Sequence, residues 1–159
     1  LAAAWAERDP TLPLAEPYEA LVLASIVERE TGVPEERGRI AGVFVRRLHR
    51  GMRLQTDPTV IYGLGEAFDG NLRREHLKDD SNPYNTYRHE GLPPTPIALP
   101  GLAALLAALQ PAEGTALYFV ARGDGSHVFS DTLGAHQRAV RKYQLKRRAG
   151  YRSVPGPGA

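Results

Sequence analysis

Apolar residues recur with a helical period near the N-terminus of the chain. Over residues 20–31, taken as a helix with about 100° between successive residues, one wide arc contains Ala20, Val22, Leu23, Ala24, Ile26 and Val27. Ser25, Glu28 and Arg29 lie together on the opposite side of this helix. Glu30, in contrast, falls inside the apolar arc, where a charged side chain is rarely found without a partner.

The pattern further along the chain predicts several helices and a small β element. The expected helices cover about residues 17–31, 33–50, 57–62, 102–109 and 132–148. Apolar runs at 117–121 and 127–130, around a glycine-rich turn, predict the two strands of a hairpin. Residues 66–96 are expected to form a long loop with one helical piece near 73–77, and loops of this length are commonly functional. The fold class is therefore α+β, with helices around a central helix that carries Glu30 and a small antiparallel β element that includes the hairpin.

Three of these helices carry further expectations. Residues 102–109 are all Ala or Leu, so we expect this helix to be buried. The helix over 33–50 ends in a basic cluster, interpreted as favourable pairing with the helix dipole, of Arg46, Arg47, His49 and Arg50. Asp57 precedes Pro58 at the start of a short helix, where the expected role of its side chain is that of an N-cap.

Length and composition indicate one globular domain with tails. The chain has 159 residues, 42% of them hydrophobic and 24% charged, and it has no cysteine, which excludes disulfides and thiolate chemistry. Residues 1–16 are expected to be a linker or arm, residues 17–148 the functional domain, and residues 149–159 a disordered tail. No stretch is long and apolar enough for a membrane span. Because the chain begins with Leu rather than Met, we interpret it as a fragment of a longer protein.

The residues that several kinds of site require are missing from this chain. The five histidines, at positions 49, 76, 89, 127 and 136, show no metal-ligand spacing, so no metal site is expected. No phosphate-binding loop or dinucleotide fingerprint occurs, so no cofactor is expected. A formal charge of +2 gives little support to nucleic-acid binding. We therefore interpret as a solvated face the basic residues Arg138, Arg141, Lys142, Lys146, Arg147 and Arg148.

The position of Glu30 suits acid chemistry. A carboxyl group held against apolar surface is desolvated, so its neutral form is favoured and its pKa should rise. A raised pKa prepares a carboxylic acid to donate a proton near neutral pH. The loops also carry amides, hydroxyls and aromatic rings of the kind that bind sugars, namely Gln55, Thr56, Asp57, Tyr62, Tyr84, Asn85 and Tyr87. Asp57 is the obvious candidate for a second carboxylate, which a glycosidase ordinarily needs.

Several long motifs resemble the YceG-like endolytic murein transglycosylases. They keep one order and similar spacings over about residues 18–145. The matching segments are LASIVERET at 23–31, GMRLQTDPTVIYG at 51–63, YNTY at 84–87, the proline-rich run at 91–101, and YFVA with HVF between 118 and 129.

The resemblance implies a lyase that cuts peptidoglycan, with Glu30 at the position of the family's catalytic glutamate. In the implied mechanism Glu30 first protonates the glycosidic oxygen between N-acetylmuramic acid and N-acetylglucosamine. It then takes the proton of the muramoyl C6 hydroxyl, which closes a 1,6-anhydro ring. Sugar binding is implied for Gln55, Thr56, Asp57, Tyr62, Asn85 and Tyr87, and Glu28 is expected to be structural or to pair with an arginine.

The resemblance also implies partners and a location. The expected partners are nascent glycan strands and, for the full-length protein, the machinery of cell-wall synthesis; neither a cofactor nor nucleic acid is among them. Relatives carry an N-terminal membrane helix and a small LysM-like module, both missing here. The expected location is therefore the cytoplasmic membrane, reached only through the missing anchor, with the catalytic domain facing the wall or periplasm.

Two other functions remain open from the residues. In a lysozyme-type hydrolase, water would attack with help from Asp57 and leave reducing ends. In a non-catalytic wall-binding domain, replacing Glu30 would leave every function intact.

Overall fold

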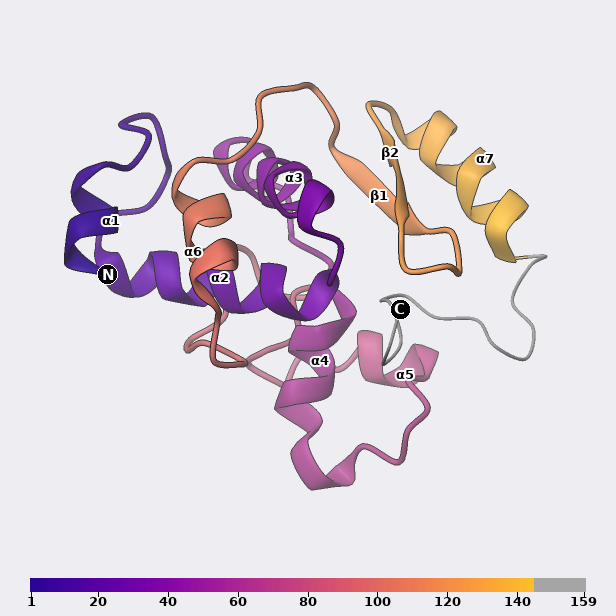
Figure 1. The fold of residues 1–159 in the computed structure, drawn as a ribbon. Coiled ribbons are helices and arrows are strands. Elements are labelled where there is room, and N and C mark those ends of the chain that lie inside the picture. The colour runs from indigo at the N-terminus through magenta and orange to yellow at the C-terminus, as the bar shows by residue number, and fades with distance from the viewer. Residues whose placement is uncertain (145–159) are drawn as a thin grey trace.

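The structure, a computed structural model, describes residues 1–144, with side chains up to residue 143. It confirms the α+β class: helices accompany one antiparallel pair of strands (Figure 1). The helices are α1 (Ala2–Ala6), α2 (Pro17–Glu30), α3 (Arg37–His49), α4 (Asp57–Leu64), α5 (Arg74–Leu77), α6 (Leu102–Leu109) and α7 (Leu133–Gln144). The strands are β1 (Tyr118–Ala121) and β2 (His127–Ser130), and 3₁₀ turns cover Pro34–Glu36 and Gly65–Ala67. The predicted tail at 149–159 and the end of the last helix, with Lys146, Arg147 and Arg148, lie outside the described residues.

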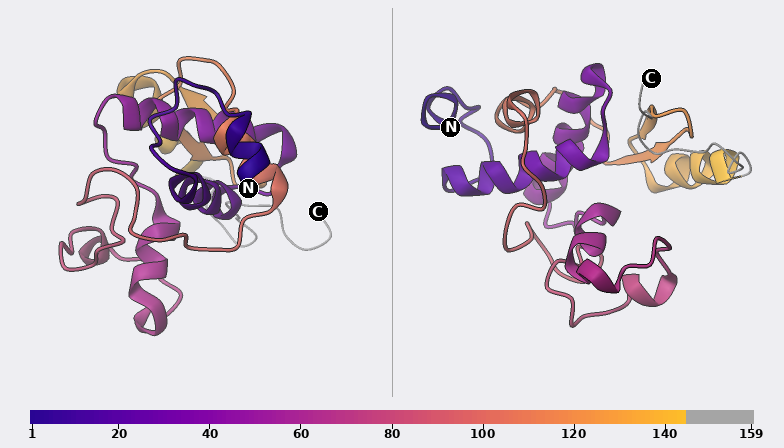
Figure 2. Two further views of the ribbon diagram at one scale, coloured as in Figure 1. Left: turned by 90° about the vertical axis from the view of Figure 1, so that its left-hand side faces the viewer. Right: turned by 60° about the horizontal axis from the view of Figure 1, so that its bottom comes forward.

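Helix α2 is the centre of the helical body. Its start is fixed by Pro17 in the first turn and by Glu19, whose carboxylate accepts the N–H groups of Ala15 and Glu16. Its apolar arc is buried against α6 and α3, which lie across it (Figures 1 and 2). The helix ends at Glu30, because the backbone of Thr31 is extended. This ending places the last turn of α2 at the edge of the core.

The first sixteen residues are packed on the domain, which differs from the expected linker or arm. Trp5 and Leu12 pack against the core, and Leu14 is itself buried. The N–H of Asp9 donates to the carbonyl of Leu109 at 3.0 Å, tying the segment to the end of α6. A few apolar residues are therefore enough to anchor a segment whose sequence shows no helical or strand period.

One expectation about burial is wrong, and one residue outside the apolar arc of its helix is also buried. Helix α6 is not buried all round, because Leu102 and Leu106 are 68% and 45% exposed on the side away from α2 and α3. Ser25, predicted on the polar side of its helix, is fully buried. Its hydroxyl donates to the carbonyl of Val22 and accepts the N–H of Ile97 at 3.0 Å, so a returning loop covers it.

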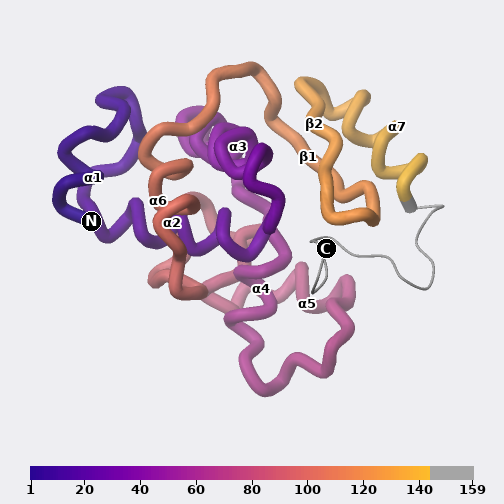
Figure 3. The backbone as a smooth tube through the Cα atoms, viewed as in Figure 1, coloured from indigo at the N-terminus to yellow at the C-terminus, as the bar shows by residue number. Residues whose placement is uncertain are grey.

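The β-hairpin is confirmed and lies beside the helical body with α7 packed on it (Figure 1). Its register pairs Tyr118 with Ser130 and Ala121 with His127. Between α4 and α6 the chain follows a long looped path below the body, interrupted by the short α5 (Figure 3). Among residues 1–144, no helix combines the length and the apolar character needed to cross a bilayer.

Candidate active site

A cleft of about 1040 Å³ separates the end of α2 and the start of α4 from the hairpin and α7. Its volume is at the upper end of the range for ligand pockets. Glu30 lines it, together with most of the residues predicted to bind sugar: Gln55, Thr56, Asp57, Tyr62 and Tyr87. The structure thus brings together segments that are far apart in the chain. Two of the residues named from the sequence, Tyr84 and Asn85, do not line the cleft.

Glu30 is held at the cleft by one hydrogen bond, which the hydroxyl of Thr56 donates to its Oε1 at 2.9 Å. Burial raises the pKa of Glu30 to about 7; the nearby charge of Asp57 adds to the rise, and the Thr56 hydrogen bond opposes it. The apolar arc of the sequence predicted this direction. Near neutral pH the carboxyl group is therefore protonated in a large fraction of molecules and can both give and take a proton.

Two buried threonines, Thr59 and Thr86, fix Thr56, whose hydroxyl is the donor to Glu30. The hydroxyl of Thr86 accepts the N–H of Thr56 at 3.0 Å and lies 2.9 Å from the hydroxyl of Thr59. Thr59 also donates to the carbonyl of Thr56 at 2.9 Å. All three are nearly inaccessible to solvent. Thr56 is therefore better placed to position Glu30 than to bind sugar.

Gln55 has an unusual backbone. Its φ of 51° is the only positive value at a non-glycine residue among those the structure describes. For a side chain without glycine's freedom this conformation costs roughly 1–2 kcal/mol. The strain is held by two bonds: the N–H of Gln55 donates to the carbonyl of Thr86 at 3.3 Å, and its side-chain oxygen accepts a long bond from Arg47 at 3.4 Å. Such strain is typical of a position where function sets the conformation.

Asp57 and Tyr87 form a pair on the floor of the cleft. The Tyr87 hydroxyl donates to Oδ1 of Asp57 at 2.5 Å. Burial, followed by the charge of Asp57, raises the pKa of Tyr87, so its hydroxyl keeps its proton. Asp57 is the first residue of α4 rather than its N-cap, which is Thr56. The expected capping role of Asp57 is therefore wrong, and its carboxylate is available to the cleft.

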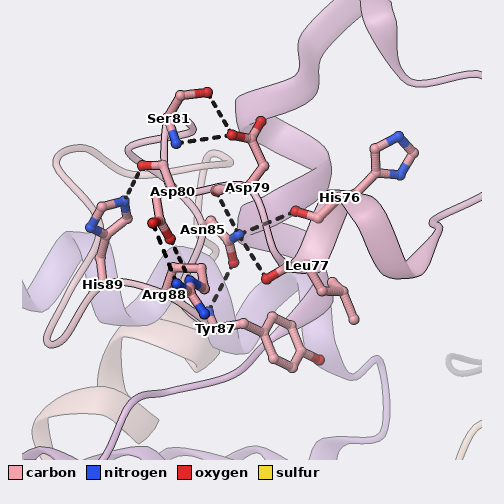
Figure 4. A network of polar contacts seen from close by, with 9 residues as sticks. All are labelled: His76, Leu77, Asp79, Asp80, Ser81, Asn85, Tyr87, Arg88 and His89. Carbon is pink, nitrogen blue, oxygen red and sulfur yellow. Dashed lines mark hydrogen bonds and ion pairs between the residues drawn. The ribbon is translucent and has the colours of Figure 1, made fainter.

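Asn85 organises the loop beneath the cleft (Figure 4). Its buried side-chain nitrogen donates to the carbonyls of His76, Leu77 and Asp79, at 3.0–3.2 Å. Its side-chain oxygen accepts the N–H of Tyr87 at 3.0 Å. Because Asn85 is fully buried, sugar cannot reach its side chain, and its role is to hold Tyr87 and the loop in place.

Tyr62 offers an aromatic surface at the rim. Its side chain is 47% exposed, and its ring meets Tyr84 edge to face with centroids 4.9 Å apart. An exposed ring fixed by a second ring suits contact with the apolar face of a sugar.

Arg47 is a cleft residue that the sequence analysis missed. Its guanidinium is buried, donating to the carbonyl of Leu117 at 2.7 Å and to that of Arg53 at 2.9 Å. Burial lowers its pKa. The dipole interpretation is therefore wrong for Arg47, which joins the hairpin to the segment before Gln55. Its spacing from Ile40 and Phe44, of seven and three residues, puts it on the buried face of the helix and was the signal available.

Glu28 confirms the structural alternative that was expected for it. Its Oε1 accepts the N–H of Gly101 at 2.6 Å, and this bond holds the loop before α6 on the end of α2.

Within residues 1–144, no three His, Asp or Glu side chains are grouped so as to hold a metal ion. The groups that line the cleft include a carboxyl group, hydroxyls, an amide and aromatic rings.

Known proteins resemble this chain in sequence. The chain is 44% identical over 126 residues to the endolytic murein transglycosylase of Bacillus subtilis, covering 79% of this chain and 34% of that protein. It is 35% identical over 129 residues to the endolytic murein transglycosylase of Streptococcus pneumoniae, covering 79% of this chain and 23% of that protein. The chain thus spans about a third or less of the length of these relatives.

A solved structure and a family profile agree with these matches. The crystal structure of a YceG-like protein from Listeria monocytogenes superposes with a TM-score of 0.69 at 43% identity, covering 76% of this chain and 38% of that one. The profile of the YceG-like family matches residues 2–142, which include every residue that lines the cleft. This chain belongs to the YceG-like family.

Proposed function

We propose that this chain is the catalytic part of an endolytic murein transglycosylase, a lyase that cleaves the glycan strands of peptidoglycan. The observation that carries the proposal is Glu30, a carboxyl group whose pKa is raised to about 7 at the wall of a cleft rich in sugar-binding side chains. The names of the B. subtilis and S. pneumoniae relatives support the same activity.

The proposed reaction uses the carboxyl group of Glu30 twice. Protonated Glu30 donates its proton to the glycosidic oxygen between N-acetylmuramic acid and N-acetylglucosamine while the bond from that oxygen to C1 breaks. The resulting carboxylate then accepts the proton of the C6 hydroxyl as O6 bonds to C1. The products are a 1,6-anhydromuramoyl end and a free 4-hydroxyl, water is not consumed, and Glu30 regains its proton. A pKa near 7 suits both steps, because neither protonation state is rare at neutral pH.

The surrounding residues have separate parts in this proposal. Thr56 aims the carboxyl group, and Asp57 raises its pKa and faces the positive charge that develops at C1. Gln55 and Tyr62 bind the sugar from the rim. Tyr87 holds Asp57, and Asn85 holds Tyr87.

A lysozyme-type hydrolase is the second candidate, because Asp57 lies in the same cleft as Glu30. In that mechanism Asp57 would assist an attacking water, and the product would carry a reducing end. The hydrogen bond from Tyr87 to Asp57 favours the lyase, since it ties up one of the oxygens that a nucleophile or base would use.

For the full-length protein we propose nascent glycan strands as substrate and the synthesis machinery as neighbour. A membrane anchor outside this chain would hold the catalytic part on the outer side of the cytoplasmic membrane, facing the wall.

Mass spectrometry of purified glycan strands digested with this chain and with Glu30→Gln tests the proposal. The lyase predicts anhydro ends that disappear with the variant. Reducing ends instead would establish hydrolysis. Strands bound equally well by both proteins and cut by neither would identify a wall-binding domain.

A further inference from the structure

Two histidines line the cleft on the wall opposite Glu30, and they differ in their partners. His127 is buried, and both its ring and its backbone are bonded to Glu36. Its Nδ1 lies 2.9 Å from Oε1 of Glu36, and its N–H donates to Oε2 at 3.0 Å. These bonds join the hairpin to the turn before α3, so the role of His127 is structural.

His136, on α7, has a fixed ring whose nitrogens have no hydrogen-bond partner among residues 1–144. Its imidazole stacks on Tyr118, with ring centroids 5.0 Å apart and planes 21° from parallel. The guanidinium of Arg47 lies 5.0 Å from the centroid of the same tyrosine ring. Neither ring nitrogen of His136 bonds to any residue within 1–144, and Nδ1 is buried.

Nδ1 has almost no accessible surface, so the ring nitrogen that can meet a ligand in the cleft is Nε2, which is not among the buried unbonded atoms. A cleft nitrogen that no described residue bonds is free to bond a ligand. Burial and the charge of Arg47 lower the pKa of His136, so the imidazole is neutral at neutral pH. A neutral imidazole has one N–H donor and one acceptor nitrogen. Such a ring suits an uncharged polar group better than an anion.

The residues around His136 indicate which kind of ligand group would fit beside it. The neighbouring cleft residues on the hairpin and α7 are apolar, namely Val120, Ala121, Leu133 and Val140. A polar group set in an apolar wall is the usual construction of a pocket that orients one part of a ligand. An amide carbonyl beside a methyl group fits both features, since the carbonyl accepts the imidazole N–H and the methyl group covers apolar surface.

We infer that His136 is a substrate-binding residue that donates a hydrogen bond to an amide carbonyl of the glycan, in a subsite on the wall opposite Glu30. This inference rests on the proposed function, because it takes peptidoglycan as the ligand. Amide carbonyls occur there in two places, the N-acetyl groups of the sugars and the peptide stems. Both have a methyl group nearby, on the acetyl group or on alanine.

Steady-state cleavage of glycan strands by three variants tests the inference. His136→Phe keeps the stack on Tyr118 but removes the donor, and His136→Gln restores an amide donor. Gln137→Ala is the matched control, since Gln137 is the exposed neighbour on α7 and does not line the cleft. We expect KM to rise roughly three- to tenfold for His136→Phe, the worth of one hydrogen bond, with kcat nearly unchanged. Partial rescue is expected for His136→Gln, and no change for Gln137→Ala.

Two modified substrates distinguish the sources of the carbonyl. If the N-acetyl group is bound, the KM difference between wild type and His136→Phe disappears on de-N-acetylated strands and persists on strands stripped of stems. If the stem is bound, the two results are exchanged. A KM for His136→Phe equal to that of the wild type on all strands would overturn the inference.

A binding experiment separates this inference from the proposed reaction. The ring nitrogen signals of His136 are followed by ¹⁵N NMR while stem-free glycan fragments, and then fragments with stems, are added to Glu30→Gln. A shift of these signals without any cleavage by the wild type would support the subsite and contradict the lyase. Cleavage without a shift would do the reverse, and no binding of either fragment would contradict both.

Discussion

The two walls of the cleft are built in different ways. On the wall of Glu30, hydroxyl groups are bonded to one another, and one of them, from Thr56, is bonded to the carboxyl group. The opposite wall presents aromatic and apolar side chains of β1 and α7. It is attached to the helical body through the Glu36–His127 pair, through Arg47, and through an edge-to-face contact of Phe44 with Phe119 at 5.6 Å.

This difference indicates a division of work. The wall built by the hydroxyls of Thr56, Thr59 and Thr86, here called the hydroxyl wall, holds the carboxyl group of Glu30 in one position and sets its pKa. Substitutions there should change kcat and its pH dependence. The opposite wall, formed by β1 and α7 and here called the aromatic wall, is shaped to receive a ligand. It is joined to the helical body by only the few contacts given above. Substitutions there should change KM or, where they cut an attachment, stability.

The largest expected effect comes from removing the acid. Glu30→Gln keeps the shape of the side chain but supplies no transferable proton. We expect turnover of glycan strands to fall by about 10²–10⁴-fold. Glu35→Gln, an exposed carboxylate on the 3₁₀ turn before α3, is the control and should keep full turnover. Residual activity of Glu30→Gln within tenfold of wild type would place the acid elsewhere.

The same variant should be more stable than the wild type above neutral pH. Because the pKa of Glu30 is raised from 4.5 to about 7 in the folded state, the fold binds this proton more tightly than the unfolded chain does. Stability therefore falls as pH rises from about 4.5 to about 7, by about 3 kcal/mol in total. Urea unfolding at pH 4 should give similar stabilities for both proteins, and at pH 8 the variant should be more stable. A difference independent of pH would argue against a raised pKa.

Cutting the attachment of the aromatic wall should cost a similar amount of stability. Glu36→Ala leaves the ring nitrogen and the N–H of His127 without partners in a buried place. We expect the free energy of unfolding to fall by about 2–4 kcal/mol. Glu35→Ala, its exposed neighbour, should change stability by less than about 0.5 kcal/mol. Equal stabilities of the two variants would show that the pair does not hold the hairpin.

The loop beneath the cleft should respond less strongly. Asn85→Ala removes the donor to three carbonyls and the acceptor for Tyr87. We expect a loss of about 1–3 kcal/mol in unfolding free energy together with lower turnover, because Tyr87 loses its position. Asn71→Ala, at an exposed loop residue, is the control. Unchanged turnover in a destabilised Asn85→Ala would confine Asn85 to a purely structural role.

The smallest effects are two opposite shifts in pH dependence. Thr56→Val removes a hydrogen bond that lowers the pKa of Glu30, so this pKa should rise further. Asp57→Asn removes a charge that raises it, so the pKa should fall. The pH profile of kcat should move in opposite directions for the two variants, by roughly one unit or less each. Shifts in the same direction would mean that another group controls the profile.

The sequence was sufficient where the pattern is local. The helical period located Glu30 within the apolar arc, and the structure raises its pKa in the expected direction. The turn residues between two apolar runs located the hairpin, and residues 102–109 form the helix expected for them. These features depend on neighbours within one or two turns of the chain.

The sequence was insufficient where a role depends on a distant partner. Arg47 acts through the carbonyl of Leu117, seventy residues away, and Thr56 is fixed by Thr86, thirty residues away. Asn85 was expected to touch sugar, but its bonds are spent on a loop whose path no local pattern specifies. The same holds for Ser25, which lies opposite the apolar arc and is buried because the loop at Ile97 covers it.

The protonation of Glu30 can be measured directly by titration, using ¹³C NMR of its side-chain carboxyl carbon from pH 3 to pH 9. Glu30→Gln identifies the signal by its absence. With its raised pKa, Glu30 should titrate with a midpoint near pH 7. A midpoint near 4.5, the ordinary value for glutamate, would contradict the proposed mechanism, because Glu30 would then be a carboxylate at neutral pH and could not be the proton donor.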